Sequence, residues 1–242
     1  MNLIIDIGNT SVKLAVFEQN KLSILERSSS SALRSSAKKL IRTFPSITKI
    51  LIAAVTDLPY GLFEELSQCA RVFILDRTFK IPFENSYKTP ETLGLDRLAL
   101  VAAATQQFPN KNKLIIDAGT CITYDFVTAK AQYLGGAISP GLQMRYKALH
   151  NNTAKLPLLE PSALTSYIGT TTEMSIHSGV VNGIIHEIQG VMSSYNSDYP
   201  DLIVILTGGD ANFLCKQFKI SIFANSNFLL EGLNFLLEYN SN

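Results

Sequence analysis

A chain of 242 residues is longer than a usual single domain, so we expect either two compact lobes or one large α/β unit. Hydrophobic residues make up 46% of the sequence and charged residues 17%, which excludes a disordered chain. The 21 basic residues nearly balance the 20 acidic residues and form no cluster, so nucleic acid is disfavoured as the main ligand.

Cysteines and apolar segments indicate where the protein works. Cys69, Cys121 and Cys215 are scattered and form no CxxC pair, which is typical of a reduced intracellular protein without a zinc site. The opening residues (MNLIID) lack the basic segment of a secretory signal, and the apolar stretch 98–104 is far shorter than the ~20 residues that span a bilayer. We therefore expect a cytoplasmic protein with no membrane partner.

Strands and helices are predicted to alternate through the first half of the chain, because short apolar runs alternate with segments of helical spacing. The expected strands are residues 3–7, 12–17, 49–55 and 72–75, and the expected helices are 33–44 and 95–107. Residues 108–112 (FPNKN) are rich in helix breakers and predict a boundary between two lobes, 1–110 and 111–242.

The second half has a similar order of elements. The expected strands are residues 114–118, 121–127 and 202–206, and the expected helices are one opening at Ser139-Pro140, one at 171–191 and one ending near Tyr239. Ser139 is predicted as the N-cap of its helix and Pro140 as the first helical residue. A Gly-Gly turn follows strand 202–206.

The two halves begin with nearly the same hexapeptide. Residues 3–8 (LIIDIG) recur as residues 114–119 (LIIDAG), and each copy continues through a Thr into a second apolar stretch. A chance match is conceivable in a chain rich in Val, Ile and Leu, but the shared continuation favours a duplication.

The first turn, residues 6–10 (DIGNT), fits a phosphate-binding loop. Backbone N–H groups and small hydroxyls of such a turn bind phosphate, and Gly8 lets the backbone approach closely. Asp6 at the end of the strand can hold Mg²⁺, directly or through water, and Lys13 can add a positive contact. An ordinary hairpin turn has the same composition, so this motif alone leaves both interpretations open.

The second copy favours the phosphate loop. Residues 117–120 (DAGT) open the second half as 6–10 open the first, and the glycine pair in 207–210 (TGGD) follows a third apolar strand. The combination predicts a nucleotide held in a cleft between duplicated lobes. It resembles the actin-like ATPase superfamily, which includes sugar kinases, acetate kinases and Hsp70-type chaperones. The resemblance implies an α/β fold of two ribonuclease H-like lobes with mixed central sheets.

Within that superfamily, one family is similar over nearly the whole chain, from residue 6 to about residue 210. The motifs in order are residues 6–10 (DIGNT), Tyr87, 94–97 (GLDR), 117–120 (DAGT), 135–142 (GGAISPGL) and 169–172 (GTTT). This set resembles the type III pantothenate kinases, and the GLDR segment is its most specific part.

The resemblance implies the reaction of ATP with pantothenate to give ADP and 4′-phosphopantothenate, and it implies a homodimer. It makes Asp96 the general base on the pantothenate hydroxyl. A second interpretation stays open, because an acid at the start of a helix also interacts favourably with the helix dipole. The two roles are compatible, since anionic substrates bind at helix N-termini.

The remaining roles carry over residue by residue. Asp117 is expected to coordinate a monovalent cation, K⁺ or NH₄⁺, and Thr120 to contact an ATP phosphate that is bound with Mg²⁺. The expected ATP-binding loop is Asp6, Ile7, Gly8, Asn9, Thr10, Ser11, Val12 and Lys13. The expected pantothenate pocket is Tyr87, Gly94, Leu95, Asp96, Arg97 and Thr172.

Other polar residues receive structural interpretations. The three histidines, His150, His177 and His186, lack partners at metal-ligand spacing, and Cys121 is expected to be a packed small residue. Two other functions remain open from the sequence: a kinase of another small alcohol or sugar, and a non-catalytic ATP-binding transcriptional accessory factor. A non-catalytic protein is expected to have lost an essential acid, whereas Asp6, Asp96 and Asp117 are all present.

Overall fold

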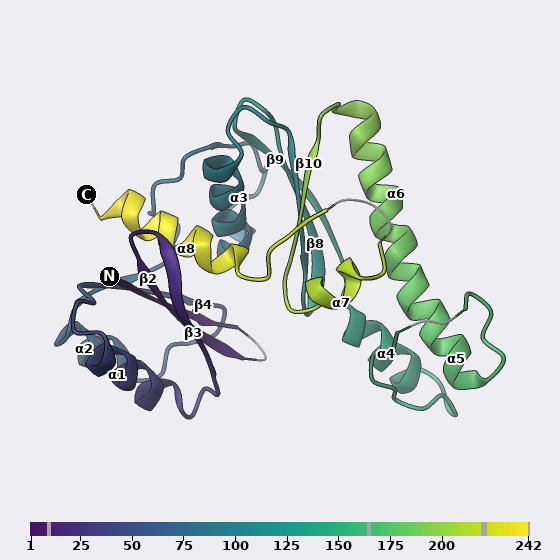
Figure 1. Ribbon diagram of the computed structural model, residues 1–242, viewed down its shortest axis with the longest axis horizontal. Coiled ribbons are helices and arrows are strands. Elements are labelled where there is room, and N and C mark those ends of the chain that lie inside the picture. The colour runs from purple at the N-terminus through teal and green to yellow at the C-terminus, as the bar shows by residue number, and fades with distance from the viewer. Residues whose placement is uncertain (9–10, 164–165, 219–221, 242) are drawn as a thin grey trace. The chain divides into compact units, whose positions relative to one another are not determined.

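The computed structural model describes residues 1–8, 11–163, 166–218 and 222–241 (Figure 1). As far as it is described, the chain divides into two compact units. The first unit comprises Met1–Phe83, Lys88–Gln106 and Phe228–Asn242, and the second unit comprises Glu84–Tyr87 and Gln107–Asn227.

Within its described residues, the first unit contains a five-stranded mixed sheet in the order β3-β2-β1-β4-β5. Strands β1, β2 and β3 are antiparallel neighbours, while β4 and β5 run parallel to β1. Their bounds are β1 Asn2–Ile7, β2 Val12–Glu18, β3 Lys21–Ser28, β4 Lys49–Ala54 and β5 Arg71–Ile74.

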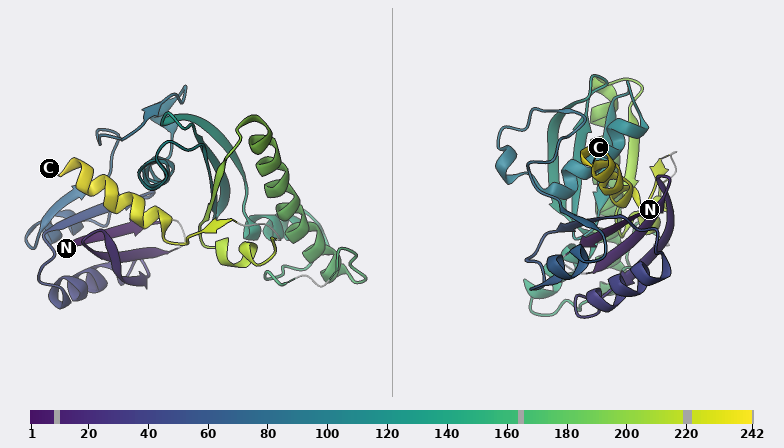
Figure 2. Two further views of the ribbon diagram at one scale, coloured as in Figure 1. Left: turned by 45° about the horizontal axis from the view of Figure 1, so that its top comes forward. Right: turned by 90° about the vertical axis from the view of Figure 1, so that its left-hand side faces the viewer.

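Helices cover both faces of this sheet, and Figure 2 shows α8 on the side opposite α1 and α2. Leu3, Ile5 and Ile7 point to one face and form a buried cluster with Leu33 of α1 and Leu62 of α2, among others. The helices of this unit are α1 Leu33–Thr43, α2 Leu62–Ser67, a 3-10 turn at Pro90–Thr92, α3 Leu95–Gln107 and α8 Phe228–Asn240.

Polar contacts join the C-terminal helix α8 to the first strand. The buried Asn2 Nδ2 donates to Asn234 Oδ1 at 2.8 Å and to Glu238 Oε1 at 2.7 Å, and Lys49 Nζ lies 2.9 Å from Glu238 Oε2. The compact units therefore differ from consecutive lobes of 1–110 and 111–242, because α8 packs with residues at the other end of the chain.

The described part of the second unit contains a six-stranded sheet in the order β11-β10-β7-β8-β9-β6. As in the first unit, two antiparallel strands (β7 and β8) open the fold, and a later strand (β10) pairs in parallel with the first of them. Their bounds are β6 Glu84–Asn85, β7 Lys113–Ala118, β8 Cys121–Val127, β9 Gln132–Pro140, β10 Ile203–Thr207 and β11 Phe223–Ala224. This shared arrangement is what the repeated hexapeptide predicts.

One face of the second sheet is buried under helices. Leu114, Ile116 and Ala118 of β7 form an apolar cluster with α4 and with a long helical segment made of α5, a π-helical turn and α6. The bounds are α4 Leu142–Asn151, α5 Thr172–His177, the π-helical turn Ser178–Asn182, α6 Gly183–Asp198 and α7 Ala211–Cys215.

Lys113, at the start of β7, is fully buried, and among the described residues its Nζ has no hydrogen-bond partner. Burial lowers the pKa of this amine, because a charged group loses its hydration inside the fold.

The predicted helix start at Ser139-Pro140 is wrong. Strand β9 continues through Pro140, with Ser139 paired to Ile122 and Pro140 to Cys121, and the helix begins at Leu142 with Gly141 as N-cap. Pairing with β8 overrides the local capping pattern, and a proline at the end of a strand costs little because it lacks only one donor. The helix at 95–107 and the long helical segment beginning near residue 171 are confirmed.

Candidate active site

The hairpin turn between β1 and β2 carries the first predicted phosphate site. Asp6 and Lys13 face each other in the register of the two strands, and Lys13 Nζ lies 3.8 Å from Asp6 Oδ2. The Gly8 N–H donates to the Ser11 carbonyl at 3.1 Å and closes the turn. Asn9 and Thr10, which belong to the predicted loop, lie outside the described residues.

The side chains of two residues of the predicted ATP loop lie in the hydrophobic core. Ile7 and Val12 are buried and belong to the apolar cluster under α1. Their side chains fix the ends of the two strands, so any contact they make with phosphate comes from the backbone. Asp6 and Lys13 remain the charged side chains of this loop.

Asp6 has an unusual electrostatic setting. Its burial raises the pKa of the carboxyl group, the charge of Lys13 lowers it, and the charge of Asp96 raises it. Asp6 and Asp96 therefore repel each other within the first unit. A cation relieves such repulsion, and Mg²⁺ is usually bound by one or two carboxylates together with phosphates and water. The donor set fits magnesium.

Asp96 lies in the first turn of α3. Its Oδ1 accepts a hydrogen bond from the Arg97 N–H at 2.8 Å, so the carboxylate does interact with the helix N-terminus. A Cβ on Gly94 would lie 2.4 Å from Asp96 Oδ1. In this rotamer the Asp96 carboxylate therefore occupies the space that a side chain at position 94 would enter. The following residue, Arg97, is buried.

The hairpin turn between β7 and β8 carries the second predicted phosphate site. Asp117 stands near the end of β7, and the Gly119 N–H donates to the Cys121 carbonyl at 2.9 Å. Thr120 at the tip of the turn is exposed, so its hydroxyl can reach a ligand.

Gly208 brings the turn after β10 against Asp117. It has a φ of +96°, and a Cβ there would lie 2.4 Å from Asp117 Oδ1 and 2.3 Å from the Ala118 carbonyl oxygen. The Asp210 N–H donates to that same carbonyl at 2.9 Å. The glycine pair that the sequence placed beside the nucleotide is thus in contact with the second phosphate turn.

Gly141 also packs against the turn between β7 and β8, as Gly208 does. Its N–H donates to the Thr120 carbonyl at 3.2 Å, and a Cβ would lie 2.2 Å from the Gly119 carbonyl oxygen. Position 141 belongs to the GGAISPGL motif, but its contact with this turn was not predicted from the sequence. Its one signal was a glycine directly before a helix and after Ser-Pro, which does not reveal a contact with a turn earlier in the chain.

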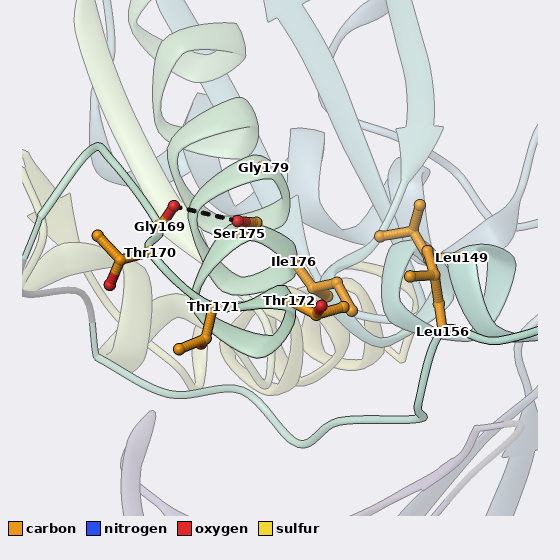
Figure 3. A pocket seen from close by; sticks show the side chains of 9 residues that line it. All are labelled: Leu149, Leu156, Gly169, Thr170, Thr171, Thr172, Ser175, Ile176 and Gly179. Carbon is orange, nitrogen blue, oxygen red and sulfur yellow. Dashed lines mark hydrogen bonds between the residues drawn. The ribbon is translucent and has the colours of Figure 1, made fainter.

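Thr172 opens α5 and lines a pocket of about 650 Å³ in the second unit (Figure 3). Hydroxyl groups and apolar side chains line it together, as Figure 3 shows, and Ser175 Oγ donates to the Gly169 carbonyl at 3.3 Å. The lining residues are Leu149, Leu156, Gly169, Thr170, Thr171, Thr172, Ser175, Ile176 and Gly179. Of the six predicted pantothenate residues, Thr172 alone is among them, so this pocket does not bring the predicted residues together.

Within the described residues, no group of three or more His, Cys, Asp and Glu side chains could hold a metal ion. A magnesium ion at Asp6 would therefore take most of its ligands from ATP and water. His177 has a structural contact instead, because its Nδ1 lies 2.8 Å from the Tyr146 hydroxyl.

Comparison with known proteins identifies the family. The family model described as type III pantothenate kinase matches residues 2–194. The type III pantothenate kinase of Christiangramia forsetii is 51% identical over 240 residues, which cover 99% of each chain. This chain belongs to the type III pantothenate kinase family. The corresponding enzyme of Flavobacterium johnsoniae is 48% identical and covers 99% of this chain and 98% of its own.

Solved structures agree on the fold of this type III pantothenate kinase family member. A putative Baf family transcriptional activator from Campylobacter jejuni has a TM-score of 0.63 at 22% identity, and the match covers 99% of both chains. A glucokinase from an Antarctic psychrotroph has a TM-score of 0.52 at 14% identity, and the match covers 98% of both chains. These likenesses confirm the predicted actin-like α/β fold. In the part of the chain that is described, no helix has the length and apolar character of a membrane span.

Proposed function

We propose that this chain transfers the γ-phosphoryl group of ATP to pantothenate, giving ADP and 4′-phosphopantothenate, the first step of coenzyme A biosynthesis. Membership of the family supports the reaction. The observation that carries the site is the setting of Asp96, whose carboxylate lies beside Gly94 and is close enough to Asp6 for its charge to raise the pKa of Asp6. We expect the reaction to take place in the cytoplasm.

Asp96 acts as the general base. The pantothenate hydroxyl oxygen attacks the γ-phosphorus, the bond from that phosphorus to the β,γ-bridging oxygen breaks, and the hydroxyl proton passes to Asp96. Phosphoryl transfer needs positioning and charge neutralisation more than covalent help, so one carboxylate at the attacking oxygen suffices. The hydrogen bond from the Arg97 N–H fixes one carboxylate oxygen and leaves the other to accept the proton.

Asp6 and Lys13 serve the ATP phosphates. Magnesium bound with ATP would lie beside Asp6, where it offsets the repulsion between Asp6 and Asp96. Lys13 supplies a fixed positive charge 3.8 Å from the same carboxylate. Backbone N–H groups of the turn are the further proposed contacts to the phosphate oxygens.

Asp117 holds a monovalent cation, K⁺ or NH₄⁺. A second magnesium site is disfavoured, because hard divalent ions favour several carboxylates or retained waters. A single carboxylate, completed by backbone carbonyl and phosphate oxygens, suits a large and weakly hydrated monovalent ion better, and the Ala118 carbonyl lies beside Asp117 at the Gly208 turn. Thr120, exposed at the tip of this turn, contacts an ATP phosphate.

The residues proposed to bind pantothenate are Tyr87, Gly94, Leu95, Asp96, Arg97 and Thr172. A homodimer is part of the proposal. Large apolar side chains exposed on the second unit support it, since an isologous interface needs such a surface. They include Leu134, Ile138, Met144, Leu158, Tyr167, Ile168 and Met174.

The variant Asp96→Asn tests this assignment. Asparagine is nearly isosteric and still accepts the Arg97 N–H, so the fold and ATP binding are retained. Loss of a general base lowers kcat by about 10²–10⁴-fold. ADP release measured with saturating ATP and pantothenate checks this, with ATP binding measured by calorimetry as the control. A fall in kcat smaller than about tenfold would remove Asp96 from the role of base.

A further inference from the structure

A stacked pair of tyrosines in the second unit includes Tyr87, a residue of the proposed pantothenate site. Tyr87 and Tyr133 stack with ring centroids 6.1 Å apart and an interplanar angle of 13°. Tyr133, in β9, is fully buried, whereas Tyr87 is only partly buried. One ring of the pair thus faces the interior, and the other is partly accessible to a ligand.

Tyr133 has a fixed orientation. Its hydroxyl donates to Asp125 Oδ1 at 2.7 Å, and Thr123 Oγ1 donates to Asp125 Oδ2 at 3.2 Å. Asp125 is fully buried in the middle of β8. A buried carboxylate is costly unless it accepts hydrogen bonds, so this pairing holds the Tyr133 ring in one position.

The backbone that carries Tyr87 is held against the same strand. β6 pairs in parallel with β9, with Glu84 opposite Gln132 and Asn85 opposite Tyr133, and the Ser86 N–H donates to the Tyr133 carbonyl at 3.0 Å. The Tyr87 N–H donates to Asn85 Oδ1 at 3.0 Å, which forms a local turn.

Gly135 leaves space for the ring itself. It has a φ of +103°, and a Cβ at this position would lie 3.2 Å from Tyr87 Cδ2 and 3.4 Å from Cε2. The ring of Tyr87 therefore lies close to the backbone of β9 at a position where the positive φ favours glycine and an added Cβ would be tight. Strand pairing, the stacked ring and the glycine each restrict the same side chain.

We infer that Tyr133, anchored by the buried Asp125, is a positioning residue that preorganises Tyr87 for binding pantothenate, an inference that rests on the proposed function. Tyr133 acts through the ring of Tyr87 and has no contact with the substrate itself. Ordering one side chain on binding costs an amount that corresponds to about a two- to tenfold loss of affinity. Because Tyr133 already orders the Tyr87 ring in the free enzyme, this loss of side-chain entropy does not accompany pantothenate binding.

The test is a double-mutant cycle on KM, with Tyr87→Leu, Tyr133→Leu and the double variant. Tyr133→Leu is expected to raise the KM for pantothenate about two- to tenfold while the KM for ATP stays within twofold. In the Tyr87→Leu background, Tyr133→Leu is expected to add nothing, because the residue through which it acts is gone.

Tyr124→Leu is the matched control. Tyr124 is equally buried, lies on the opposite face of the same sheet, and donates its hydroxyl to a carboxylate, Glu187, at 2.8 Å. It should lose stability as Tyr133→Leu does, yet keep the wild-type KM for pantothenate. A merely structural role for Tyr133 predicts the same kinetics for both variants.

An unchanged KM for pantothenate in Tyr133→Leu, or additive effects in the double variant, would overturn the inference. Should Tyr133→Leu fail to fold, Tyr133→Phe replaces it, because it removes only the bond to Asp125 and keeps the buried ring. An unchanged KM for pantothenate in Tyr133→Phe then overturns the inference. Wild-type protein that turns over no pantothenate would instead remove the proposed function, and this inference with it.

Discussion

Helices α3 and α8 of the first unit approach each other at a glycine, and filling that position should loosen the fold. Gly232 is buried in α8, and a Cβ there would lie 2.2 Å from the Ala99 carbonyl oxygen and 2.8 Å from its carbon. Ordinary contact begins at 3.4 Å. Gly232→Ala therefore forces the two helices about 1.2 Å apart, the difference between these two distances, and backbone atoms cannot rotate away as a side chain can.

The expected cost follows from two opposing effects. Overpacking of this kind destabilises by about 1–3 kcal/mol, and occasionally more. Replacing glycine by alanine within a helix stabilises the folded state by up to about 1 kcal/mol, because alanine has the higher helix propensity. Because the clash is with backbone, we expect a net loss of about 1–2 kcal/mol, or a Tm lower by about 2–8 °C for a chain of this length.

The same substitution should reduce activity, because α3 carries Asp96 at its first turn. A displacement of about 1 Å from the productive geometry can lower turnover by as much as ~10²-fold. Thermal unfolding and kcat are measured on Gly232→Ala and on Gly190→Ala. Gly190 lies in α6 with nothing within 4 Å of an added Cβ, so the control should be as stable as the wild type or slightly more stable. Equal or higher stability of Gly232→Ala would refute the close packing of α3 on α8.

Three further predictions concern charge and assembly. Asp117→Asn should reduce the activation by K⁺, at fixed magnesium and ionic strength, more than it alters the magnesium dependence of activity. Steady-state assays that show unchanged K⁺ activation would leave Asp117 only the role of a phosphate-loop carboxylate. Lys113→Met should raise the Tm at pH 7 by a few degrees, because burial lowers the pKa of the amine and the folded state disfavours its charge. That gain should shrink as the pH rises toward the ordinary lysine value of 10.5, where the unfolded chain also loses the proton, and a constant gain would contradict it. Sedimentation should show a dimer of the 26.6 kDa chain at micromolar concentration, and a monomer alone would contradict the homodimer.

Local sequence patterns predicted much of the fold. The hexapeptide repeat anticipated the paired hairpins, and helical spacing anticipated α3 within its observed bounds. Local rules failed where pairing over a distance decides the structure. Ser139 and Pro140 look like a helix start, yet they are the last residues of β9, because β8 supplies partners for them. Strand β3 went unnoticed, since much of it is exposed and it lacks an apolar run.

Local motifs also predicted some contacts of the candidate site and missed those between segments far apart in the sequence. Asp6 and Lys13 are neighbours because strand register places them opposite each other, which a hairpin motif reveals. The packing of Gly208 on Asp117 and of Gly141 on the Gly119 turn joins segments far apart in the sequence. Spacing alone gave no reason to single out Tyr87 or Thr172, and only the resemblance to a family identified them. The bond from Tyr133 to Asp125 likewise depends on pairing between β8 and β9.

The chain is proposed to phosphorylate pantothenate with Asp96 as the base. The most direct measurement incubates the purified chain with MgATP in potassium, with and without pantothenate, and identifies the product by mass spectrometry. We expect ADP and 4′-phosphopantothenate in equal amounts, no ADP above background without pantothenate, and loss of both products in Asp96→Asn. ADP release that is independent of pantothenate, or phosphoryl transfer only to another alcohol or a sugar, would contradict it.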